Sequence, residues 1–313
     1  MYYFIINPKS RTGRGKQIWD YVKKKIDSLQ IQYYFFYTKH AGHATELATF
    51  ICNKFHKQKN IVVLGGDGTL NEVINGVTCF DDVCLSYIPS GSSNDFARSL
   101  HIPNDVDKAL TIALTPEKQV TVDIGEVQLL NLDGSLKSQR RFAVSCGLGY
   151  DASICYEALN SKLKRLLNKF HLGKLTYGLI AAKQVFCYRF VSGDLIVDGA
   201  LRGHYDQILF IVGMVHPYEG GGAKLAPQAD YKDQKLSVCF VHNLKRWQVF
   251  CLLPTAFIAQ HTRFAGVEVF DCENFELIQD VEKVTHTDGE YGGTTTRIKM
   301  CCNQHHLLVN TSL

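Results

Sequence analysis

The residues of this chain best suited to chemistry form a glycine-rich turn within the stretch VVLGGDGTLNEVING, residues 62–76. Glycine-rich turns between a strand and a helix commonly hold phosphates, because exposed backbone N–H groups and the helix N-terminus favour anions. Asp67 lies in the middle of this turn. Its carboxylate would repel phosphate unless a cation intervenes, or unless it binds a ribose, a water or a hydroxyl group. The turn therefore predicts a magnesium-bound nucleotide beside an alcohol; the alternative is that Asp67 only caps a helix that starts at Thr69.

The elements around this turn alternate between strand and helix over about the first 120 residues. Short apolar strands are expected at 2–7, 31–37, 60–66 and 83–89, and helices at 16–29, 42–55, 69–76, 95–100 and 106–114. Gly76 can end the third helix at its C′ position. Such alternation predicts a parallel sheet with helices on both faces. Ligands of such sheets bind at the carboxyl ends of the strands, where this sequence has the polar segments NPKS, YTKH, GGDG and PSGSS.

After Val120 the pattern changes to many short strands joined by turns. Helical stretches interrupt them at about 151–186 and 244–260. The pattern predicts mostly antiparallel pairing and a sandwich-like second domain, with a boundary near Ile124. The C-terminal segments TTTRIKM and HHLLVN fit strands of either domain.

Composition excludes several classes of protein. Hydrophobic residues make up 46% of the 313 residues and charged residues 20%, which is an ordinary globular balance. The net charge of +4 is too small to imply nucleic acid, although it is compatible with a nucleotide or an anionic membrane surface. The eleven cysteines include no C-x-x-C pair and indicate a reducing cytosol rather than a disulfide framework or zinc site. No apolar run approaches the ~18 residues that span a bilayer.

Other familiar motifs are missing or weak. The chain has no G-x-x-x-x-G-K-[ST] motif, and the G-x-G-x-x-A match at 147–152 lies in the strand-rich half, where a tight strand-to-helix turn is the better interpretation. His40 and His43 flank a helix start and fit surface or capping roles better than metal binding. The segment 161–183 has six Lys/Arg and no acid. It fits docking on anionic lipid, or a solvated helix face that packs its leucines inward.

The glycine-rich turn belongs to a larger set of motifs in a fixed order. Gly65–Thr69 (GGDGT) is also typical of NAD kinases and phosphofructokinases. The further motifs are Asn7-Pro8-Lys9-Ser10, Thr38 with Gly42-His43-Ala44, Pro89–Arg98 (PSGSSNDFAR), Gly220–Gly222 with Ala226–Ala229, and Asp288-Gly289-Glu290. Together they resemble the diacylglycerol kinase catalytic-domain family, which includes sphingosine kinases and soluble bacterial lipid kinases. The matches span nearly the whole chain and are closest to the bacterial diacylglycerol kinases.

The resemblance implies a fold with two domains. The first is a doubly wound parallel α/β domain like that of NAD kinases and phosphofructokinases. It comprises residues 1–124 together with residues 295–313, where the chain returns to this domain. The second is a β-sandwich that binds the lipid, over residues 125–294. It also implies a cytoplasmic enzyme working at the inner face of the membrane on a lipid substrate. The oligomeric state stays open, with a homodimer among the options.

The resemblance also implies roles for individual residues. Glu290 would be the general base on the lipid hydroxyl, with Asp67 orienting magnesium-bound water or that hydroxyl, although the two roles can be exchanged. Asn94, Asp95 and Asp288 would belong to the same active site; the alternatives are helix capping for the first two and turn formation for Asp288. The implied nucleotide-binding residues are Asn7, Pro8, Lys9, Ser10, Arg11, Thr38, Gly65, Gly66, Asp67, Gly68, Thr69, Leu70, Asn71, Glu72 and Ser92.

A structural Mg2+ site in the second domain is the last implied feature. Its matching positions are Asp233 through the carboxylate, and Asp230 and Lys235 through backbone oxygens. The sequence departs from the family pattern in having Gln234 after Asp233, where glycine is usual. If that position has a positive φ, glutamine there costs ~1 kcal/mol. A second departure is Arg11, where the first loop often has glycine; its guanidinium can bind phosphate bidentately.

Three functions are compatible with these residues. The first is an ATP-dependent, Mg2+-requiring kinase that phosphorylates diacylglycerol or another lipid alcohol, such as a sphingoid base, a ceramide or a polyprenol. The second is an enzyme like NAD kinase, whose acceptor is a ribose. The third is a protein that binds nucleotide or lipid without catalysis. The N-P-x-S loop and the N-D-F segment favour the lipid kinase over NAD kinase, and Glu290 with Asp67 argues against a loss of catalysis.

Overall fold

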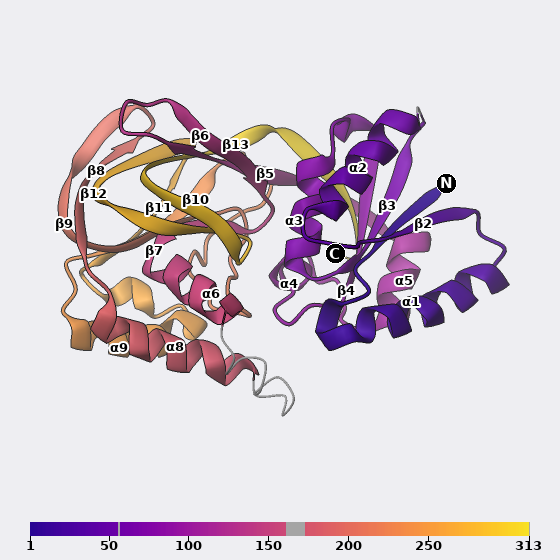
Figure 1. Ribbon diagram of the computed structural model, residues 1–313, viewed down its shortest axis with the longest axis horizontal. Helices are drawn as coiled ribbons and strands as arrows, with labels where there is room; N and C mark the ends of the chain where they lie inside the picture. Colours follow the sequence, from indigo (N-terminus) through magenta and orange to yellow (C-terminus); the bar gives the residue numbers. More distant parts are fainter. Residues whose placement is uncertain (56, 161–172, 313) are drawn as a thin grey trace. The chain divides into compact units, whose positions relative to one another are not determined.

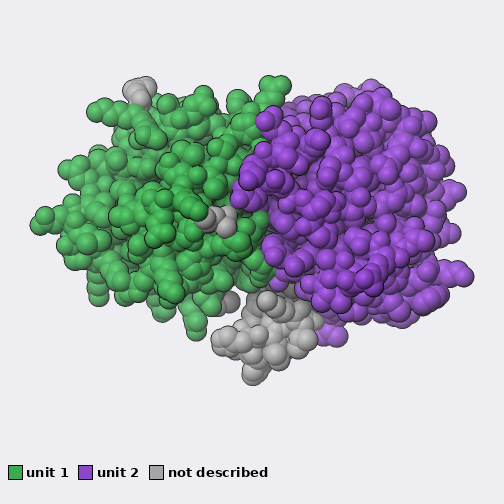
Figure 2. Space-filling model, turned by 180° about the vertical axis from the view of Figure 1, so that it is seen from behind, with its two compact units in different colours: residues 1–124, 303–313 green, residues 125–302 purple. Residues whose placement is uncertain are grey.

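The chain, seen in a computed structural model that describes residues 1–55, 57–160 and 173–312, divides into two compact units. Unit 1 comprises residues 1–124 and 303–313, and unit 2 comprises residues 125–302 (Figure 2). The C-terminal return to unit 1 therefore begins at residue 303 and not at the predicted 295. The two predicted C-terminal strands are parts of one long strand, β13 (Glu290–Thr311), which crosses from unit 2 into unit 1.

Unit 1 is the predicted parallel α/β fold. Its strands are β1 (Tyr2–Ile6), β2 (Tyr33–Tyr37), β3 (Lys59–Gly65), β4 (Val83–Pro89) and the end of β13, arranged in the order β13-β4-β3-β1-β2. Every pairing of that order is parallel. β3 and β4 are almost entirely buried, as continuous apolar strands of a parallel sheet are. The fold class predicted from the alternating pattern is confirmed.

Helices cover both faces of this sheet (Figure 1). They are α1 (Ser10–Ser28), α2 (His43–Lys54), α3 (Asp67–Gly76), α4 (Asp95–Ser99) and α5 (Val106–Leu114), with the short 3-10 helix η1 (Phe80–Asp82). α1 contacts α5 through Tyr21, whose hydroxyl donates to Asp107 at 2.8 Å. α2 contacts α3, and Gly76 is the last residue of α3 rather than its C′ residue. A Cβ on Gly76 would lie 2.2 Å from Thr45 O, so this glycine permits close helix packing instead of ending the helix.

Unit 2 is the predicted strand-rich domain. Its strands are β5 (Lys118–Leu130, which begins in unit 1), β6 (Leu136–Phe142), β7 (Ser145–Gly149), β8 (Val191–Val197), β9 (Ala200–Met214), β10 (Leu236–His242), β11 (Val267–Cys272), β12 (Asn274–Thr287) and most of β13. The pairings that involve β5 through β12 are antiparallel wherever their register is known. β9 and β12 each pair with β8 over one part of their length and with β7 over another. This change of partner encloses one large apolar core, which includes Phe142, Leu195, Ile211, Phe275 and Met300.

The helices of unit 2 are α6 (Tyr150–Asn160), α8 (Gly173–Cys187) and α9 (Arg246–Thr255), followed by the 3-10 helices η2 (Ala256–Ile258) and η3 (His261–Arg263). α6 directly follows β7, so the G-x-G-x-x-A segment is the predicted strand-to-helix turn. Residues 161–172 of the basic segment lie outside the described residues. No helix of the described part of the chain is long and apolar enough to cross a bilayer.

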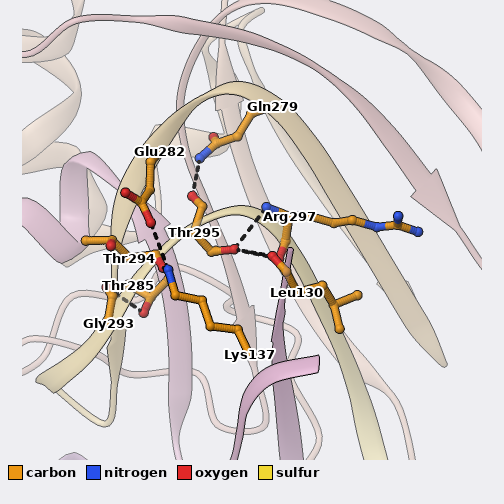
Figure 3. Close-up of polar contacts among 9 residues, drawn as sticks. All are labelled: Leu130, Lys137, Gln279, Glu282, Thr285, Gly293, Thr294, Thr295 and Arg297. Carbon is orange, nitrogen blue, oxygen red and sulfur yellow. Dashed lines mark hydrogen bonds and ion pairs between the residues drawn. The ribbon is translucent and has the colours of Figure 1, made fainter. Parts of the chain in front are cut away.

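Side chains hold the β12–β13 hairpin together where its backbone ladder is irregular (Figure 3). The register shifts between Ile278 and Lys283. Gln279 there donates its side-chain amide to the carbonyl of Thr295 at 3.1 Å, and the Thr295 hydroxyl donates to the carbonyl of Leu130 on β5 at 2.9 Å. These bonds replace missing ladder bonds, because buried backbone groups require a partner. The hairpin whose turn carries Asp288 is thus fixed to its neighbouring strand.

Candidate functional site

Four loops meet at the carboxyl edge of the unit 1 sheet, as the sequence predicts. The loops after β1 and β4 are joined by Ser10 and Ser90, whose hydroxyl oxygens lie 2.7 Å apart. The loops after β1 and β3 are joined by Asn7, whose side-chain amide donates to Thr69 Oγ1 at 3.0 Å. Thr38, after β2, donates its backbone N–H to Ile6 O at 2.8 Å. The predicted nucleotide-binding segments are therefore brought together, each from a different strand.

The glycines of these loops permit an unusually close approach of two backbones. A Cβ on Gly91 would lie 2.7 Å from the Cα of Gly66, and a Cβ on Gly66 would lie 3.2 Å from the Cα of Gly91. Ser90 also donates its N–H to Gly65 O at 2.7 Å. The turns after β3 and β4 therefore form one surface rich in glycine backbone, at the N-terminus of α3. This is the type of surface that can contact phosphate oxygens closely.

Asp67 does not cap α3, so that alternative is wrong. It is the first residue of α3, and Gly66 at the N-cap position makes no side-chain cap. The Asp67 carboxylate instead accepts the backbone N–H of Asp95 at 3.3 Å, at the start of α4. The acid therefore links the turns after β3 and β4. An anion at the starts of two helices is favoured by both helix dipoles.

Three residues of the GGDGT-LNE segment support the turn instead of forming its surface. Leu70 and Asn71 are fully buried, so their side chains pack into unit 1 beneath the turn. Glu72 accepts the backbone N–H of Gly42 at 2.8 Å and that of Ala44 at 3.0 Å. Both oxygens of its carboxylate are therefore used to hold the first turn of α2. Glu72 thus positions the T-x-x-x-G-x-A loop relative to α3.

Asn94 and Asp95 also have mainly positioning contacts. Asn94 is the N-cap residue of α4, with φ of 52°, but its side chain makes no cap hydrogen bond. Its Oδ1 accepts the N–H of Gly91 at 2.9 Å, and its Nδ2 donates to Asn104 Oδ1 at 3.0 Å. Asp95 is paired with Arg98 at 2.5 Å. The alternative that the Asn94 side chain only caps a helix is therefore wrong. Asn94 instead holds the glycine loop after β4, which also contains Ser92.

The first loop continues directly into α1, which starts at Ser10 rather than at the predicted 16. Arg11 has φ of 49°, a left-handed conformation that glycine adopts most easily and that fits a position where the family often has glycine. Lys9, Arg11, Arg14 and Lys16 are exposed around this helix start, and its first turn has no acid. Clustered cations at a helix N-terminus favour an anionic ligand. Pro8 completes the loop between β1 and α1.

The D-G-E segment of unit 2 forms the turn between β12 and β13. Asp288 and Gly289 have φ of 50° and 80°, and Thr287 pairs with Glu290 across the turn. The buried Asp288 carboxylate accepts three backbone N–H groups, from Ala143 at 2.8 Å, Val144 at 2.8 Å and Ser145 at 3.0 Å. Asp288 therefore ties the turn to the start of β7, as the alternative interpretation expected. Glu290, in contrast, is exposed at the start of β13.

A buried charge cluster that the sequence analysis missed lies beside this turn. His286 on β12 is fully buried, and its Nε2 lies 2.9 Å from Asp151 Oδ2 and 2.9 Å from Glu219 Oε1. Although burial opposes ionisation, the adjacent carboxylates raise the pKa of His286 well above its ordinary value. An imidazolium thus holds two carboxylates from α6 and from the loop before Gly220. The three residues are far apart in the sequence, so no spacing signals them.

The predicted Mg2+ ligands of unit 2 lie in one turn. Asp233 Oδ1 accepts the N–H of Lys235 at 3.0 Å, and Asp230 O accepts the N–H of Asp233 at 3.4 Å. Carboxylate and backbone carbonyl oxygens are the hard donors that Mg2+ prefers, so this donor set fits the ion. A further group that could hold a cation within the described residues is His40, His43 and Glu46 on unit 1; the Asp151–Glu219–His286 cluster could do so only if the His286 imidazole were neutral.

Gln234 has φ of 60°, so the condition under which glutamine is unfavourable at this position is met. We expect Gln234→Gly to raise the free energy of unfolding by about 0.5–1 kcal/mol. The change relieves the strain of a non-glycine residue with positive φ, which is roughly 1–2 kcal/mol. Glycine also increases the conformational entropy of the unfolded chain, and this lowers stability by a smaller amount, roughly 0.5–1 kcal/mol. Urea unfolding measures the change. Lys232→Gly in the same turn is the control, because Lys232 has no positive φ and should only lose stability; an equal gain from both changes would contradict the strain argument.

Comparisons with known proteins agree with this arrangement. A family profile described as "Diacylglycerol kinase catalytic domain" matches residues 1–127, and one described as "YegS C-terminal NAD kinase beta sandwich-like domain" matches residues 146–306. The chain is 31% identical over 300 residues to "Putative lipid kinase YtlR" of Bacillus subtilis, with 94% of each chain covered. It is 26% identical over 291 residues to a diacylglycerol kinase of Staphylococcus saprophyticus, covering 92% of this chain and 88% of the relative.

Solved structures show the same fold. A diacylglycerol kinase from Bacillus anthracis superposes with a TM-score of 0.69 at 18% identity, covering 99% of this chain and 96% of that one. A yeast NADH kinase superposes with a TM-score of 0.52 at 9% identity, over 100% and 84% of the two chains. From the profiles and the 31% identical relative, the chain is a kinase that belongs to the diacylglycerol kinase catalytic-domain family.

Proposed function

We propose that this kinase transfers the γ-phosphate of ATP to the primary hydroxyl of diacylglycerol and thereby makes phosphatidic acid, with Mg2+ as cofactor. The observation that carries the proposal is the paired glycine turn of unit 1, where Gly66 and Gly91 bring two backbones together beside Asp67. That surface suits a polyphosphate, and the cations around the start of α1 add to its attraction for one. The family membership supplies the reaction class.

Phosphoryl transfer requires mainly positioning and charge stabilisation from the protein. In unit 1, the backbone N–H groups of the glycine turns and the cations near Ser10 would bind the phosphates. Asp67 would orient the hydroxyl or a water on the metal, and Mg2+ supplies neutralisation of the phosphate charge when bound. Asp230, Asp233 and Lys235 would hold a second, structural Mg2+ through their oxygens.

In unit 2, Glu290 would accept the proton of the lipid hydroxyl. It is exposed, whereas Asp288 in the same turn is committed to three backbone hydrogen bonds. A proton acceptor needs an accessible carboxylate on a fixed support, and the anchored hairpin provides that support. Because ATP is found in the cytosol and the acceptor in a bilayer, we place the enzyme in the cytoplasm at the inner face of the membrane.

The proposal is tested by an acceptor screen with labelled ATP. Diacylglycerol in mixed micelles, a sphingoid base, a ceramide, a polyprenol and NAD are compared at equal concentration. We expect the highest kcat/KM with diacylglycerol. A preference for another lipid alcohol would overturn the choice of diacylglycerol, and turnover with NAD alone would overturn the assignment of a lipid acceptor. Nucleotide binding without turnover of any acceptor would mean that catalysis has been lost.

A further inference from the structure

Large apolar side chains are exposed together on the helices of unit 2. Leu179 and Phe186 on α8, Trp247 on α9, and Phe257 and Ile258 on η2 are 57%, 69%, 62%, 57% and 65% exposed. Leu179 and Phe186 are two helical turns apart and therefore lie on the same face of α8. Several exposed apolar side chains of this size on neighbouring elements are typical of a surface that binds a partner.

The elements that carry these side chains are directly connected. Arg246, at the start of α9, donates its guanidinium N–H groups to Phe186 O and to Tyr188 O, both at 3.0 Å. The rings of Phe186 and Phe250 lie 5.2 Å apart, and η2 continues from the last residue of α9. Figure 1 shows α8 and α9 side by side along one end of unit 2. We call the surface formed by Leu179, Phe186, Trp247, Phe250, Phe257 and Ile258 the α8–α9 surface.

The charges of these segments all have the same sign. Residues 178–191 contain Lys183 and Arg189, residues 244–264 contain Lys245, Arg246 and Arg263, and neither range contains an Asp or Glu. Of the five, Lys183 is paired with Glu157 of α6 at 2.6 Å. The α8–α9 surface is therefore apolar with a basic surround.

This charge pattern favours an anionic bilayer over a second copy of the chain as the partner of the α8–α9 surface. In a symmetric dimer the same surface would face itself, so each copy would bring its cations against the cations of the other. An anionic bilayer instead pairs the Lys and Arg side chains with lipid headgroups while Trp, Phe, Leu and Ile enter the boundary between headgroups and acyl chains. Trp is especially suited to that boundary.

We propose that the α8–α9 surface is the membrane-docking surface of this enzyme, and that it binds bilayers containing anionic phospholipid. The proposal rests on the proposed function, because an enzyme that phosphorylates diacylglycerol must reach a substrate that lies in a bilayer. It concerns α8, α9 and η2, and it does not depend on the basic residues at 161–172. Vesicle binding without ATP or diacylglycerol measures it separately from catalysis.

The chain contains a built-in reporter for this test. It has two tryptophans, of which Trp19 is fully buried in unit 1 and Trp247 lies on the α8–α9 surface. We expect the emission of Trp247 to shift to shorter wavelength, and to be quenched by brominated acyl chains, when vesicles of phosphatidylcholine and phosphatidylserine are added. Vesicles of phosphatidylcholine alone should give a much smaller effect.

Variants locate the binding surface. The double change Phe257→Ser/Ile258→Ser should weaken vesicle binding by tenfold or more, and Lys245→Glu/Arg263→Glu should remove the preference for phosphatidylserine. Phe50→Ser is the matched control, because Phe50 is a 43% exposed aromatic residue on α2 of unit 1; it should bind like the unaltered protein. All three variants should retain turnover of a water-soluble short-chain diacylglycerol.

Three results would overturn the docking proposal. Absence of a Trp247 response on anionic vesicles, or equal binding by the Phe257→Ser/Ile258→Ser variant, would overturn the proposal. A Trp247 shift that grows with protein concentration in the absence of lipid would show that a second copy covers the surface, which would also overturn it. Vesicle binding by a protein that phosphorylates no lipid would reject the proposed function and leave the docking surface standing.

Discussion

Glu290→Gln is expected to lower kcat by about 10²–10⁴-fold, as removal of a general base does, with little change in nucleotide affinity. The substitution keeps the size of the side chain and removes its ability to accept a proton. The hairpin should be unaffected, because Asp288 and not Glu290 makes the buried bonds that hold the turn. The measurement is steady-state turnover of diacylglycerol, together with direct titration of nucleotide.

Glu273→Gln serves as the control for this prediction, since Glu273 is an exposed glutamate just before the opposite end of β12. It should leave kcat unchanged. If Glu290→Gln also leaves kcat unchanged, the proton acceptor is Asp67, and Asp67→Asn should then cause the loss. Parallel losses in kcat and in nucleotide affinity would show that Glu290 belongs to the nucleotide site instead.

His286→Leu is expected to lower the free energy of unfolding of unit 2 by about 3–5 kcal/mol, the usual cost of leaving a buried charge uncompensated. The change would leave the carboxylates of Asp151 and Glu219 facing each other without the imidazolium between them. Urea unfolding followed through Trp247 in a Trp19→Phe background reports the stability of unit 2. His204→Leu is the control, because His204 pairs with Asp194 on an exposed surface, where solvent screens such pairs and their removal changes stability little.

The effect of His286→Leu should depend on pH in one direction. The pKa of His286 is raised in the folded chain, so its contribution to stability is fully present below the ordinary histidine pKa of about 6.5. That contribution is lost as pH rises through the raised folded value. The difference between His286→Leu and the unaltered protein should therefore shrink as pH rises through the raised folded pKa of His286. A difference that does not shrink in alkaline solution would contradict the assignment of an imidazolium.

The fold of unit 1 could be predicted because the sequence patterns that specify it are local. Alternation of buried strands with amphipathic helices fixes a parallel sheet, and the helix at 106–114 has the predicted bounds. The start of α1 was not predictable, because residues 10–15 have no apolar periodicity and include residues with positive φ. Leu70 and Asn71 were assigned to the nucleotide through the family resemblance, and their burial in the core is visible only in the structure.

The strand pairing of unit 2 could not be predicted from the sequence. Its strand-rich character follows from local patterns, but the exchange of partners by β9 and β12 depends on contacts between distant segments. The same limit applies to Asp151, Glu219 and His286, which meet only after folding. Asp288 was identified from its motif, but only the structure shows that its carboxylate accepts the backbone N–H groups of Ala143, Val144 and Ser145 at the start of β7.

The proposed reaction is tested most directly by transfer of label from ATP, labelled in its γ-phosphate, to the organic phase of an assay with diacylglycerol micelles. We expect labelled phosphatidic acid that requires Mg2+ and is nearly lost with Glu290→Gln or Asp67→Asn. Label that enters NAD but no lipid, or phosphatidic acid formed at an undiminished rate by the variant that carries both substitutions, would contradict the proposed reaction.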